Sequence, residues 1–322
     1  MNPTLSIIIP AYNVCDFIGL ALESIQAQTC PPDEIIIIDD GSSDGTLGRV
    51  HSFAFDSRVV VVSQHNRGQG PARNLGAQLA TSDYLYFFDA DDLICVDFVE
   101  SIKTILNGFR LPDLLLFSGS VIGNSFSPYL RGVTLSTTTP FNVLRHLKDD
   151  HRSSSCSPCL YVVKRSFWGE ARLSFMPNYF EDEALFYPLI LSSSSCCIVD
   201  IVLFSRRIRS GSTMTMVLND KHVQGALDGI VLTSDLLAKE PSSFARQLLA
   251  ERLLFFIAKY IHVCLKTKRR PLLRLLFGHR LPFLFQLKVA KLLSEGHVFN
   301  ILKSTYSKMS SFSLPPHPPA QP

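Results

Sequence analysis

Short apolar runs, each followed at once by polar residues, alternate with helical segments through the first third of this chain, and this alternation constrains its fold most. The runs are Leu5–Ile9, Glu34–Ile38, Val59–Val62 and Tyr84–Phe88. Between the first two, the segment Asp16–Gln28 carries apolar residues at helical spacing. Strands that alternate with helices in this order form a mostly parallel, doubly wound sheet with helices on both faces. We therefore expect an α/β fold.

Polar residues follow each of these four strands. They are Tyr12 and Asn13 after the first, Asp39 and Asp40 after the second, Asn66 to Gly70 after the third, and Asp89, Asp91 and Asp92 after the fourth. The carboxyl ends of parallel strands lie at one edge of an open α/β sheet, where ligands bind. Four polar clusters at these positions therefore indicate a single binding site.

Three carboxylates, those of Asp89, Asp91 and Asp92, come directly after the buried aromatic run of the fourth strand. Repulsion and desolvation make such a cluster unfavourable without a cation, and hard oxygen ligands suit Mg²⁺ or Mn²⁺ with phosphates completing the shell. Aspartates are also common at strand ends and helix starts, so the cluster alone does not establish a metal site. A calcium loop is excluded because Leu93 and Ile94 stand where it needs an oxygen ligand and a glycine.

The turn after the first strand, Pro10–Asn13, excludes two common nucleotide sites. A dinucleotide fold needs glycines there and a P-loop needs a lysine, and this turn has neither. Asp39 or Asp40 could instead accept a hydrogen bond from a base N–H, while a metal on the aspartate cluster holds a diphosphate. Two plainer interpretations stay open: Asp40 and Gly41 form an ordinary turn, and Arg73 is a solvated helix residue.

Composition excludes some classes of protein. The chain has 322 residues, 46% of them hydrophobic and 18% charged, so it can bury a large core. A net charge of +3, with no basic block interleaved with aromatic residues in the first part of the chain, argues against nucleic-acid binding. The start lacks the basic region and long apolar run of a signal peptide, so we expect a cytoplasmic protein.

The 8 cysteines are scattered, several of them within apolar runs, and are expected to be reduced thiols. Cys156 and Cys159 have the spacing of a zinc or redox pair, and His146 and His151 lie just upstream. Their order matches no common zinc module, so a small zinc site is the lesser alternative.

Beyond residue 112 the pattern becomes less regular. Asp113–Phe117 and Pro158–Lys164 are expected strands, and Phe180–Tyr187 opens a helix whose first turn carries Glu181 and Asp182. Acidic residues are common at helix starts because the helix macrodipole favours them. Capping is therefore a sufficient explanation of these carboxylates from the local sequence.

In this order, the segments Pro10–Asn13, Ile38–Thr46, Asn66–Gly76 and Phe88–Asp92 resemble the motifs of the family 2 inverting glycosyltransferases with the GT-A fold. The resemblance covers the first third of the chain. It implies a GT-A type, Rossmann-like domain, a nucleotide-sugar donor and a metal-dependent reaction.

The resemblance also implies roles for individual residues. Asp40, with Asp39 beside it, would contact the base, usually uracil, and Arg73 would serve the nucleotide or the diphosphate. Asp89 and Asp91 would form the D-x-D motif that binds Mn²⁺ or Mg²⁺, with Asp91 the principal ligand. The rest of the expected nucleotide-sugar site is Pro10, Tyr12, Asn13 and Asn66.

The same family places a Glu-Asp pair before a helix and uses a carboxylate there as the general base. The matching residues are Glu181 and Asp182, and Asp182 is the better candidate. Phe180 departs from the family, in which glycine is frequent at this position. Further on, Val202–Ser212 resembles the family's strand and basic turn, in which Arg207 or Arg209 could approach the leaving diphosphate.

The C-terminal third is expected to be helical. One helical face is marked by Leu253, Phe256, Ile257, Tyr260, Ile261 and Cys264, and the other by Arg252, Lys259 and Lys266. Charges interrupt each apolar run, so no membrane span is expected. The basic segment Lys259–Lys308 could lie on an anionic membrane surface or simply pack on the catalytic domain. The tail Leu314–Pro322 is expected to be disordered.

These patterns together predict four parts of the chain. They are a nucleotide-sugar-binding half (1–112), an acceptor and catalytic-base half (113–215), a basic amphipathic helical region (216–313) and a Pro-rich tail (314–322). The expected enzyme moves a sugar, usually from UDP, to a hydroxyl of a saccharide or lipid-linked glycan in cell-surface polysaccharide or lipo-oligosaccharide synthesis, in the cytoplasm or at the cytoplasmic face of the inner membrane. The alternative is a catalytically silent sugar-nucleotide or glycan-binding module on the same fold.

Overall fold

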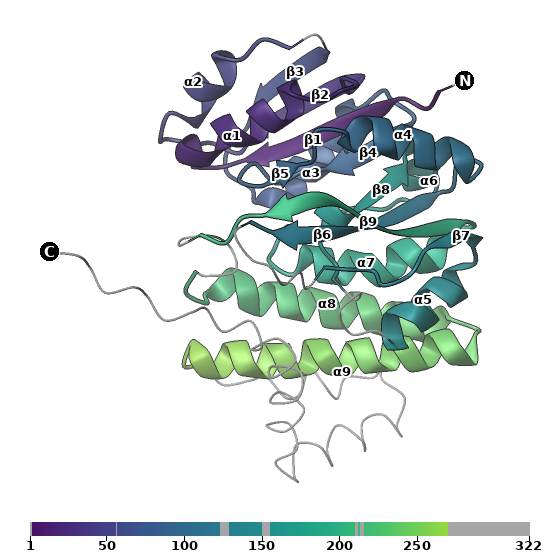
Figure 1. Ribbon diagram of the computed structural model, residues 1–322. Coiled ribbons are helices and arrows are strands. Elements are labelled where there is room, and N and C mark those ends of the chain that lie inside the picture. The colour runs from purple at the N-terminus through teal and green to yellow at the C-terminus, as the bar shows by residue number, and fades with distance from the viewer. Residues whose placement is uncertain are drawn as a thin grey trace, which may run out of the picture. The chain divides into compact units, whose positions relative to one another are not determined.

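The structure is a computed structural model, and it describes residues 2–269 apart from 56, 123–128, 150–154, 210–211 and 213–215 (Figure 1). The chain divides into two compact units, Met1–Val217 and Leu218–Pro322. The first unit contains a sheet with its helices, and the described part of the second is a pair of helices.

The first unit begins with a parallel sheet. Its strands are β1 (Leu5–Ala11), β2 (Glu34–Asp39), β3 (Arg58–Ser63) and β4 (Tyr84–Phe87), and they lie in the order β3-β2-β1-β4. The connecting helices are α1 (Cys15–Gln26), α2 (Thr46–His51) and α3 (Gln69–Leu79). The chain passes from β1 through β2 to β3 on one side and then returns to the other side of β1 for β4. This reversal is a topological switch point, where open α/β sheets bind ligands.

Beyond β4 the sheet is mixed. The later elements are β5 (Leu93–Ile94), α4 (Phe98–Gly108), β6 (Leu114–Val121), β7 (Leu135–Thr138), α5 (Pro140–Asp149), η2 (Pro158–Leu160), β8 (Tyr161–Lys164), α6 (Arg165–Glu170), α7 (Glu181–Ser192) and β9 (Cys196–Arg206). β8 lies antiparallel between β4 and β6, and β9 runs parallel to β6 and antiparallel to β5 and β7. Figure 1 shows the continuous sheet from β3 and β2 through β1 and β4 to β6 and β9. The expected α/β class is confirmed. Its parallel strands are β1–β4 and the separate pair β6 and β9.

β9 starts at Cys196, upstream of the expected start at Val202. Cys196, Cys197 and Ile198 are buried and pair with β6. A run of serines precedes them in the sequence. These short, weakly patterned residues predict a loop, whereas pairing with the buried strand β6 extends the sheet.

An aromatic group fixes the loop that carries the aspartates. The ring centroid of Tyr86 lies 4.5 Å from that of Phe98, 6.0 Å from that of Phe88 and 6.1 Å from that of Phe117. All four rings are buried, and each contributes roughly 1.5–3 kcal/mol through burial. They come from β4, the residue after it, α4 and β6, so the strand end beside Asp89 is held from several directions.

The second unit is a helical hairpin of α8 (Asp220–Lys239) and α9 (Ser243–Lys266). Asn219 and His222 form a capping box at the start of α8, and Ser242 caps α9. A Cβ on Gly229 would lie 2.4 Å from Phe256, so the two helices approach closely there. The expected apolar face of α9, from Leu253 to Cys264, is buried. Within the expected C-terminal region, α8 and α9 supply the helices, which end at Lys266. The remaining basic segment and the Pro-rich tail lie outside the described residues.

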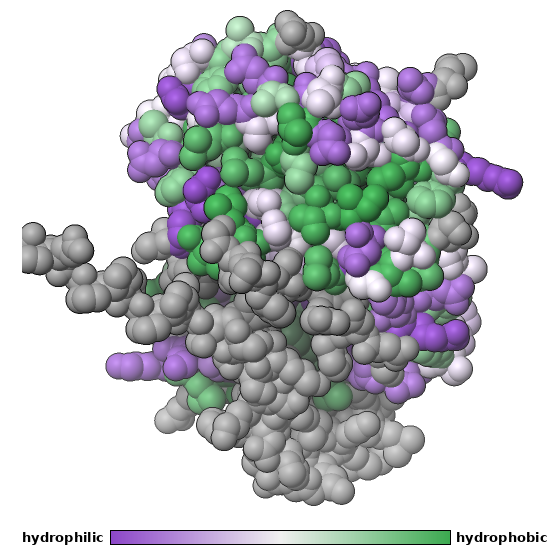
Figure 2. Space-filling model, in the orientation of Figure 1, coloured by the Kyte–Doolittle hydropathy of each residue, from purple (hydrophilic) through white to green (hydrophobic). Residues whose placement is uncertain are grey.

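Apolar side chains also reach the surface of the first unit. Figure 2 shows hydrophobic residues gathered on the face that Figure 1 presents around α4 and β9. Exposed apolar residues of this unit include Val96, Ile201 and Val202. Within the described part of the chain, no helix is long and apolar enough to cross a membrane.

Candidate active site

The loops after β1 and β2 are tied together by Asn13. Its side-chain Oδ1 accepts a hydrogen bond from the Ser43 amide at 2.9 Å, and its own amide donates to Ser42 Oγ at 3.0 Å. Asn13 has a φ of 49°, a left-handed conformation that asparagine tolerates well. Tyr12 next to it is 49% exposed, so its ring is available at the carboxyl edge of the sheet. Pro10 stays within β1 and pairs with Ile38.

Asp39 and Asp40 are both 3% exposed, but their carboxylates have different surroundings. Asp40 accepts hydrogen bonds from Gln64 Nε2 at 2.7 Å, from the Arg67 amide at 2.9 Å and from the Gly68 amide at 2.8 Å. Both of its oxygens therefore shape the loop after β3, which also contains the exposed Asn66. Asp39 Oδ1 accepts one hydrogen bond, from the Ser42 amide at 3.1 Å. Asp39 thus keeps more acceptor capacity than Asp40.

Arg73 is a buried bridge, and the interpretation of it as a solvated helix residue is wrong. Its guanidinium is 2% exposed and donates from Nη1 to Glu181 at 2.8 Å and from Nη2 to Asp89 at 2.7 Å. Burial alone would lower the pKa of Arg73, but Asp89 and Glu181 raise it well above its ordinary value. The bridge joins the aspartate loop after β4 to the start of α7.

The segment before α7 docks on α3 because α3 carries Gly70 and Asn74. A Cβ on Gly70 would lie 2.1 Å from the carbonyl oxygen of Met176, so only glycine allows this approach. Asn74 Nδ2 donates to the Phe175 carbonyl and Asn74 Oδ1 accepts from the Phe175 amide, both at 2.8 Å. The Phe175 ring lies 5.2 Å from the Arg73 guanidinium carbon. Gly70, Arg73 and Asn74 belong to the motif Asn66–Gly76 that the sequence indicated, whereas Phe175 and Met176 were not singled out from the sequence.

The two acidic residues at the start of α7 have different surroundings. Glu181 is 2% exposed and accepts hydrogen bonds from Gln69 Nε2 at 2.6 Å and from Arg73. Burial, together with the nearby Asp182, raises the pKa of Glu181 to about 8, and Arg73 opposes this shift. Asp182 is half-buried, and its Oδ1 accepts a hydrogen bond from the Glu183 amide at 2.7 Å. Glu181 is therefore anchored inside the protein, while Asp182 is closer to solvent.

The basic turn after β9 meets the aspartate loop. Arg209 Nε donates to Asp91 Oδ2 at 2.6 Å. The Arg207 amide donates to Asp92 Oδ1 at 2.7 Å, and Arg207 Nε donates to the Asp91 carbonyl at 3.0 Å. Arg209 also lies over the Phe17 ring, 4.8 Å from its centroid.

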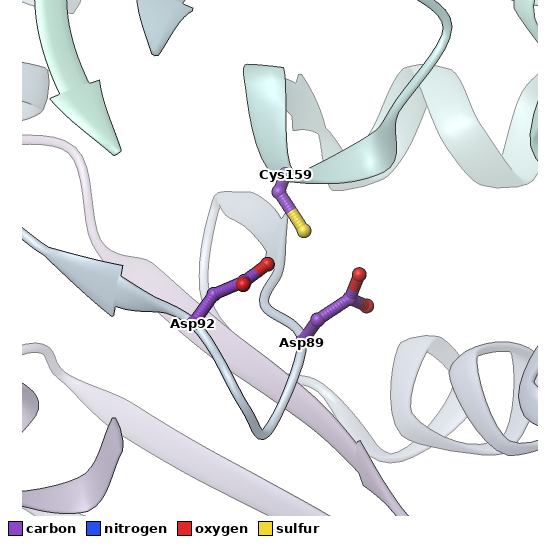
Figure 3. A group of neighbouring side chains, drawn as sticks. All are labelled: Asp89, Asp92 and Cys159. Carbon is purple, nitrogen blue, oxygen red and sulfur yellow. The ribbon is translucent and has the colours of Figure 1, made fainter. Parts of the chain in front are cut away.

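Within this loop, the Asp89 and Asp92 side chains point toward Cys159 of η2, and the ligand atoms of the three residues lie within 4.8 Å of each other (Figure 3). Burial and the neighbouring Asp89 raise the pKa of Asp92 to about 8, against the effect of Arg206. Burial raises the pKa of the Cys159 thiol well above its ordinary value. This is the one group of three or more metal-binding side chains found within the described residues.

The zinc alternative built on Cys156 and Cys159 gains no support here. Cys159 faces the two aspartates, and His146 Nε2 instead lies 2.6 Å from the Arg131 carbonyl oxygen. His151 lies outside the described residues. None of the eight cysteines, which all lie in the described part of the chain, forms a disulfide.

The aspartate loop suits a divalent cation. Its donors are carboxylate oxygens, and the Asp91 side chain is 18% exposed, so this carboxylate is within reach of solvent and ligand. Burial raises the pKa of Asp92 first, and the nearby carboxylates of Asp89 and Asp91 add to this shift. A cation bound at Asp91 would offset part of the negative charge of this loop.

Comparison with known proteins agrees with this geometry. Residues 6–132 match the family described as glycosyl transferase family 2. Glycosyltransferase GlyG of Streptococcus pneumoniae is 27% identical over 66% of this chain and 74% of its own length. The uncharacterized glycosyltransferase YibD of Escherichia coli is 40% identical over 33% of this chain, a region that spans 31% of YibD.

Solved structures share the fold. TarS of S. aureus, determined in complex with UDP, aligns over 80% of this chain and 72% of its own with a TM-score of 0.64 and 17% identity. The mannosyltransferase PcManGT of Pyrobaculum calidifontis, in complex with GDP-Man and Mn²⁺, aligns over 97% of this chain and 85% of its own with a TM-score of 0.55 and 16% identity.

The fold is thus the GT-A type that the motifs implied, and the protein class is that of the glycosyltransferases. The part of the chain that is similar to glycosyl transferase family 2 is residues 6–132.

Proposed function

We propose that this chain is a metal-dependent, inverting hexosyltransferase. It moves a sugar from a nucleotide diphosphate, with UDP as the favoured nucleotide, to a hydroxyl of a saccharide or lipid-linked glycan. The product belongs to cell-surface polysaccharide or lipo-oligosaccharide synthesis. One observation carries this proposal. Arg73 binds Asp89 and Glu181 at once, so the aspartate loop and the start of α7 are held at one edge of the sheet. The metal-binding aspartates and the general base, which are distant in the sequence, would then face the same substrate.

On the donor side, Asp39 is the better partner for a base N–H, because Asp40 is occupied by the loop after β3. Pro10, Tyr12, Asn13 and Asn66 would surround the nucleotide. UDP is supported by its presence in the TarS complex, although PcManGT was determined with GDP-Man.

Asp91, with Asp89 beside it, would hold Mn²⁺ or Mg²⁺. The bound cation would offset the charge of the leaving diphosphate. Arg209 pairs with Asp91. Its guanidinium would therefore lie near the proposed metal site and could contact the diphosphate. Arg73 donates hydrogen bonds to two carboxyl groups, those of Asp89 and Glu181. It would therefore position these residues rather than bind the phosphates.

On the acceptor side, Asp182 would be the general base. The acceptor oxygen attacks the anomeric carbon while the bond from that carbon to the diphosphate oxygen breaks, and the hydroxyl proton passes to the Asp182 carboxylate. The nucleoside diphosphate then leaves with the bonding electron pair. Glu181 is less suited to this role because it is buried and held by Arg73 and Gln69.

A donor-hydrolysis assay tests the proposal. The full chain would be incubated with UDP-glucose, UDP-galactose, UDP-N-acetylglucosamine or GDP-mannose, with Mn²⁺ or with a chelator, and release of the nucleoside diphosphate would be measured. Metal-dependent release from at least one donor is expected. Binding of UDP without release from any donor, even when acceptor sugars are added, would favour the alternative of a silent binding module on this fold.

We further propose that the enzyme works in the cytoplasm, with the basic segment Lys259–Lys308 on the anionic surface of the inner membrane. Residues 270–308 lie outside the described part of the structure, so this proposal rests on charge. Co-sedimentation with anionic vesicles is expected to weaken as salt increases. Absent or salt-insensitive binding would contradict it.

A further inference from the structure

Phe180, the residue immediately before the acidic pair of α7, has a left-handed backbone with φ 69° and ψ 20°. An L-residue in this region brings its Cβ close to the following carbonyl oxygen, at a cost of roughly 1–2 kcal/mol. Glycine adopts the same φ without this cost. The chain therefore keeps a bulky aromatic residue where the backbone favours glycine.

Phe180 is also the N-cap residue of α7, and its side chain makes no capping hydrogen bond. Asparagine would tolerate the left-handed φ and could cap the helix, which typically contributes about 1 kcal/mol. The ring of Phe180 is only half-buried, so core burial offsets these two losses incompletely. Backbone preference and helix capping therefore do not favour phenylalanine at this position.

The backbone on both sides of Phe180 is firmly held. Upstream, Phe175 is paired with Asn74 by two hydrogen bonds. Downstream, Glu181 is anchored by Arg73 and Gln69. A strained conformation persists where the surrounding structure determines it in this way, and such residues concentrate at ligand sites. The ring of Phe180 therefore has a defined place two residues before Asp182.

Two tyrosines accompany this ring. Tyr179 is half-buried, and its pKa is raised by burial, by Glu181 and by Tyr12. Tyr12 lies in the loop after β1, at the edge of the sheet where Arg73 joins the start of α7 to the aspartate loop. The ring of Tyr12 is 49% exposed. Tyr179 and Phe180 directly precede the acidic pair of α7, and Tyr12 lies at the same edge of the sheet.

We propose that Phe180 is an acceptor-binding residue whose ring packs on the apolar C–H face of a pyranose, with Tyr12 and Tyr179 beside it. This inference rests on the proposed function and adds the substrate class: a cyclic sugar rather than an acyclic polyol. A pyranose has an apolar face and a polar rim, which matches a half-exposed phenyl ring flanked by tyrosine hydroxyls. Packing on Phe180 would turn one rim hydroxyl toward Asp182.

The test uses two substitutions of Phe180 and a matched control in the full chain. Phe180→Gly relieves the backbone and removes the ring, whereas Phe180→Tyr keeps the ring. Arg172→Gly is the control, because Arg172 is another non-glycine residue with a left-handed φ, 51°, on an exposed turn. For each protein the unfolding temperature, the donor hydrolysis rate with Mn²⁺, and the stimulation of UDP release by methyl pyranosides of glucose, galactose, mannose and N-acetylglucosamine or by sorbitol would be measured.

Phe180→Gly is expected to unfold at the same or a higher temperature and to keep donor hydrolysis. Its kcat/KM for the stimulating pyranoside should fall about tenfold, equivalent to about 1.4 kcal/mol. Phe180→Tyr and Arg172→Gly should keep normal stimulation. Equal stimulation of wild type by sorbitol, no stimulation by any pyranoside, or unchanged pyranoside kinetics in Phe180→Gly would each overturn the inference.

A purely structural role would give a different pattern, in which Phe180→Gly lowers the unfolding temperature and donor hydrolysis together; that result would also overturn the inference. Failure of the proposed function is distinguishable, because wild type would then release no nucleoside diphosphate from any donor, with or without a sugar.

Discussion

At the scale of single residues, the arrangement around Arg73 is the feature that most affects the proposed chemistry. One guanidinium pairs with carboxyl groups from two segments that are distant in the sequence. The Glu181 side chain is 2% exposed and the Asp89 side chain 25% exposed, so Glu181 depends on the pairing most. Breaking a buried ion pair by removing one partner typically costs about 3–5 kcal/mol, since an uncompensated charge remains. Residue-level predictions therefore separate structural from catalytic carboxylates.

Arg73→Lys is expected to lower the free energy of unfolding by a few kcal/mol, on the order of the cost of breaking a buried pair. A lysine ammonium is a point charge and cannot bind Asp89 and Glu181 with two separate N–H groups as the guanidinium does. Denaturant unfolding with a matched substitution of the surface residue Arg49 measures the difference. Unchanged stability with weakened UDP binding would instead assign Arg73 to the nucleotide.

Asp182→Asn is expected to fold, to bind UDP with Mn²⁺ almost normally, and to transfer sugar roughly a hundred- to ten-thousand-fold more slowly, because a positioned general base is lost. Steady-state kinetics and calorimetry of the same preparation provide the measurements.

Glu181→Gln is the companion substitution for this test. It replaces the buried carboxyl group that Arg73 and Gln69 hold, and should mainly change stability. If Glu181→Gln were the inactive protein and Asp182→Asn kept its turnover, the general base would be Glu181 rather than Asp182.

At the scale of elements, the contact of α3 with the segment before α7 positions the acidic pair. α3 packs against β1 through Gly76, where a Cβ would lie 2.3 Å from Ile8, and against the segment at 175–177 through Gly70 and Asn74. The glycines in this helix lower its intrinsic helix propensity. In exchange they permit backbone approaches that no larger residue allows.

Gly70→Ala is expected to destabilise the fold by roughly 1–3 kcal/mol and to reduce turnover, because the added Cβ must displace the Met176 carbonyl, a backbone group. Gly48→Ala in α2 is the matched control. A Cβ on Gly48 meets nothing within 4 Å, so this change should stabilise by roughly 0.5–1 kcal/mol. Equal effects of the two substitutions in thermal unfolding would show that α3 does not position the segment.

The capping box of α8 predicts a pH dependence. Burial, and then Lys259, lowers the pKa of His222 below its ordinary value of 6.5, and its Nδ1 accepts a hydrogen bond from the Asn219 amide at 3.1 Å. The unfolded chain therefore binds the proton more readily than the folded one. The contribution of His222 is present above the unfolded pKa and is lost as the pH falls below it.

His222→Gln should flatten this pH dependence, because glutamine at the same position supports a capping box but does not titrate. His262, whose pKa is lowered by burial, Lys266 and Lys259, should leave a residual dependence. Unfolding temperatures measured between about pH 5 and 8 give the comparison. Identical slopes for both proteins would contradict the assignment to His222.

At the scale of the whole molecule, the sheet brings four loops to one edge, and its core fixes the strand ends that carry them. The division of the chain into the halves 1–112 and 113–215 and the helical region 216–313 stays a prediction. The structure adds that the first unit, Met1–Val217, contains every residue proposed for the donor and acceptor sites.

Removal of the metal is expected to affect donor binding and turnover together, because Asp91 and the diphosphate repel each other without a cation. UDP titrated into the full chain should bind at least tenfold more weakly with a chelator than with Mn²⁺, a difference of about 1.4 kcal/mol. Asp91→Asn should abolish most of this metal effect. Equal affinity in the two conditions would contradict the metal assignment.

The sequence by itself determined the α/β class, the four parallel strands and the convergence of polar loops, because short apolar runs ending in polar residues permit few other folds. It also located Asp89, Asp91, Glu181 and Asp182, because acidic residues at a strand end and at a helix start can be recognised from the local sequence.

Only the tertiary structure decided how these residues are used. Three sets of contacts join positions that are distant in the chain. Arg73 joins Asp89 to Glu181, and Asp40 accepts hydrogen bonds from the loop after β3. Asn74 and Gly70 dock the segment before α7. Such contacts depend on how strands and helices pack, so local sequence patterns do not predict them. The antiparallel placement of β8 and the early start of β9 are further cases, because pairing with neighbouring strands, rather than the residues' own propensity, determines them.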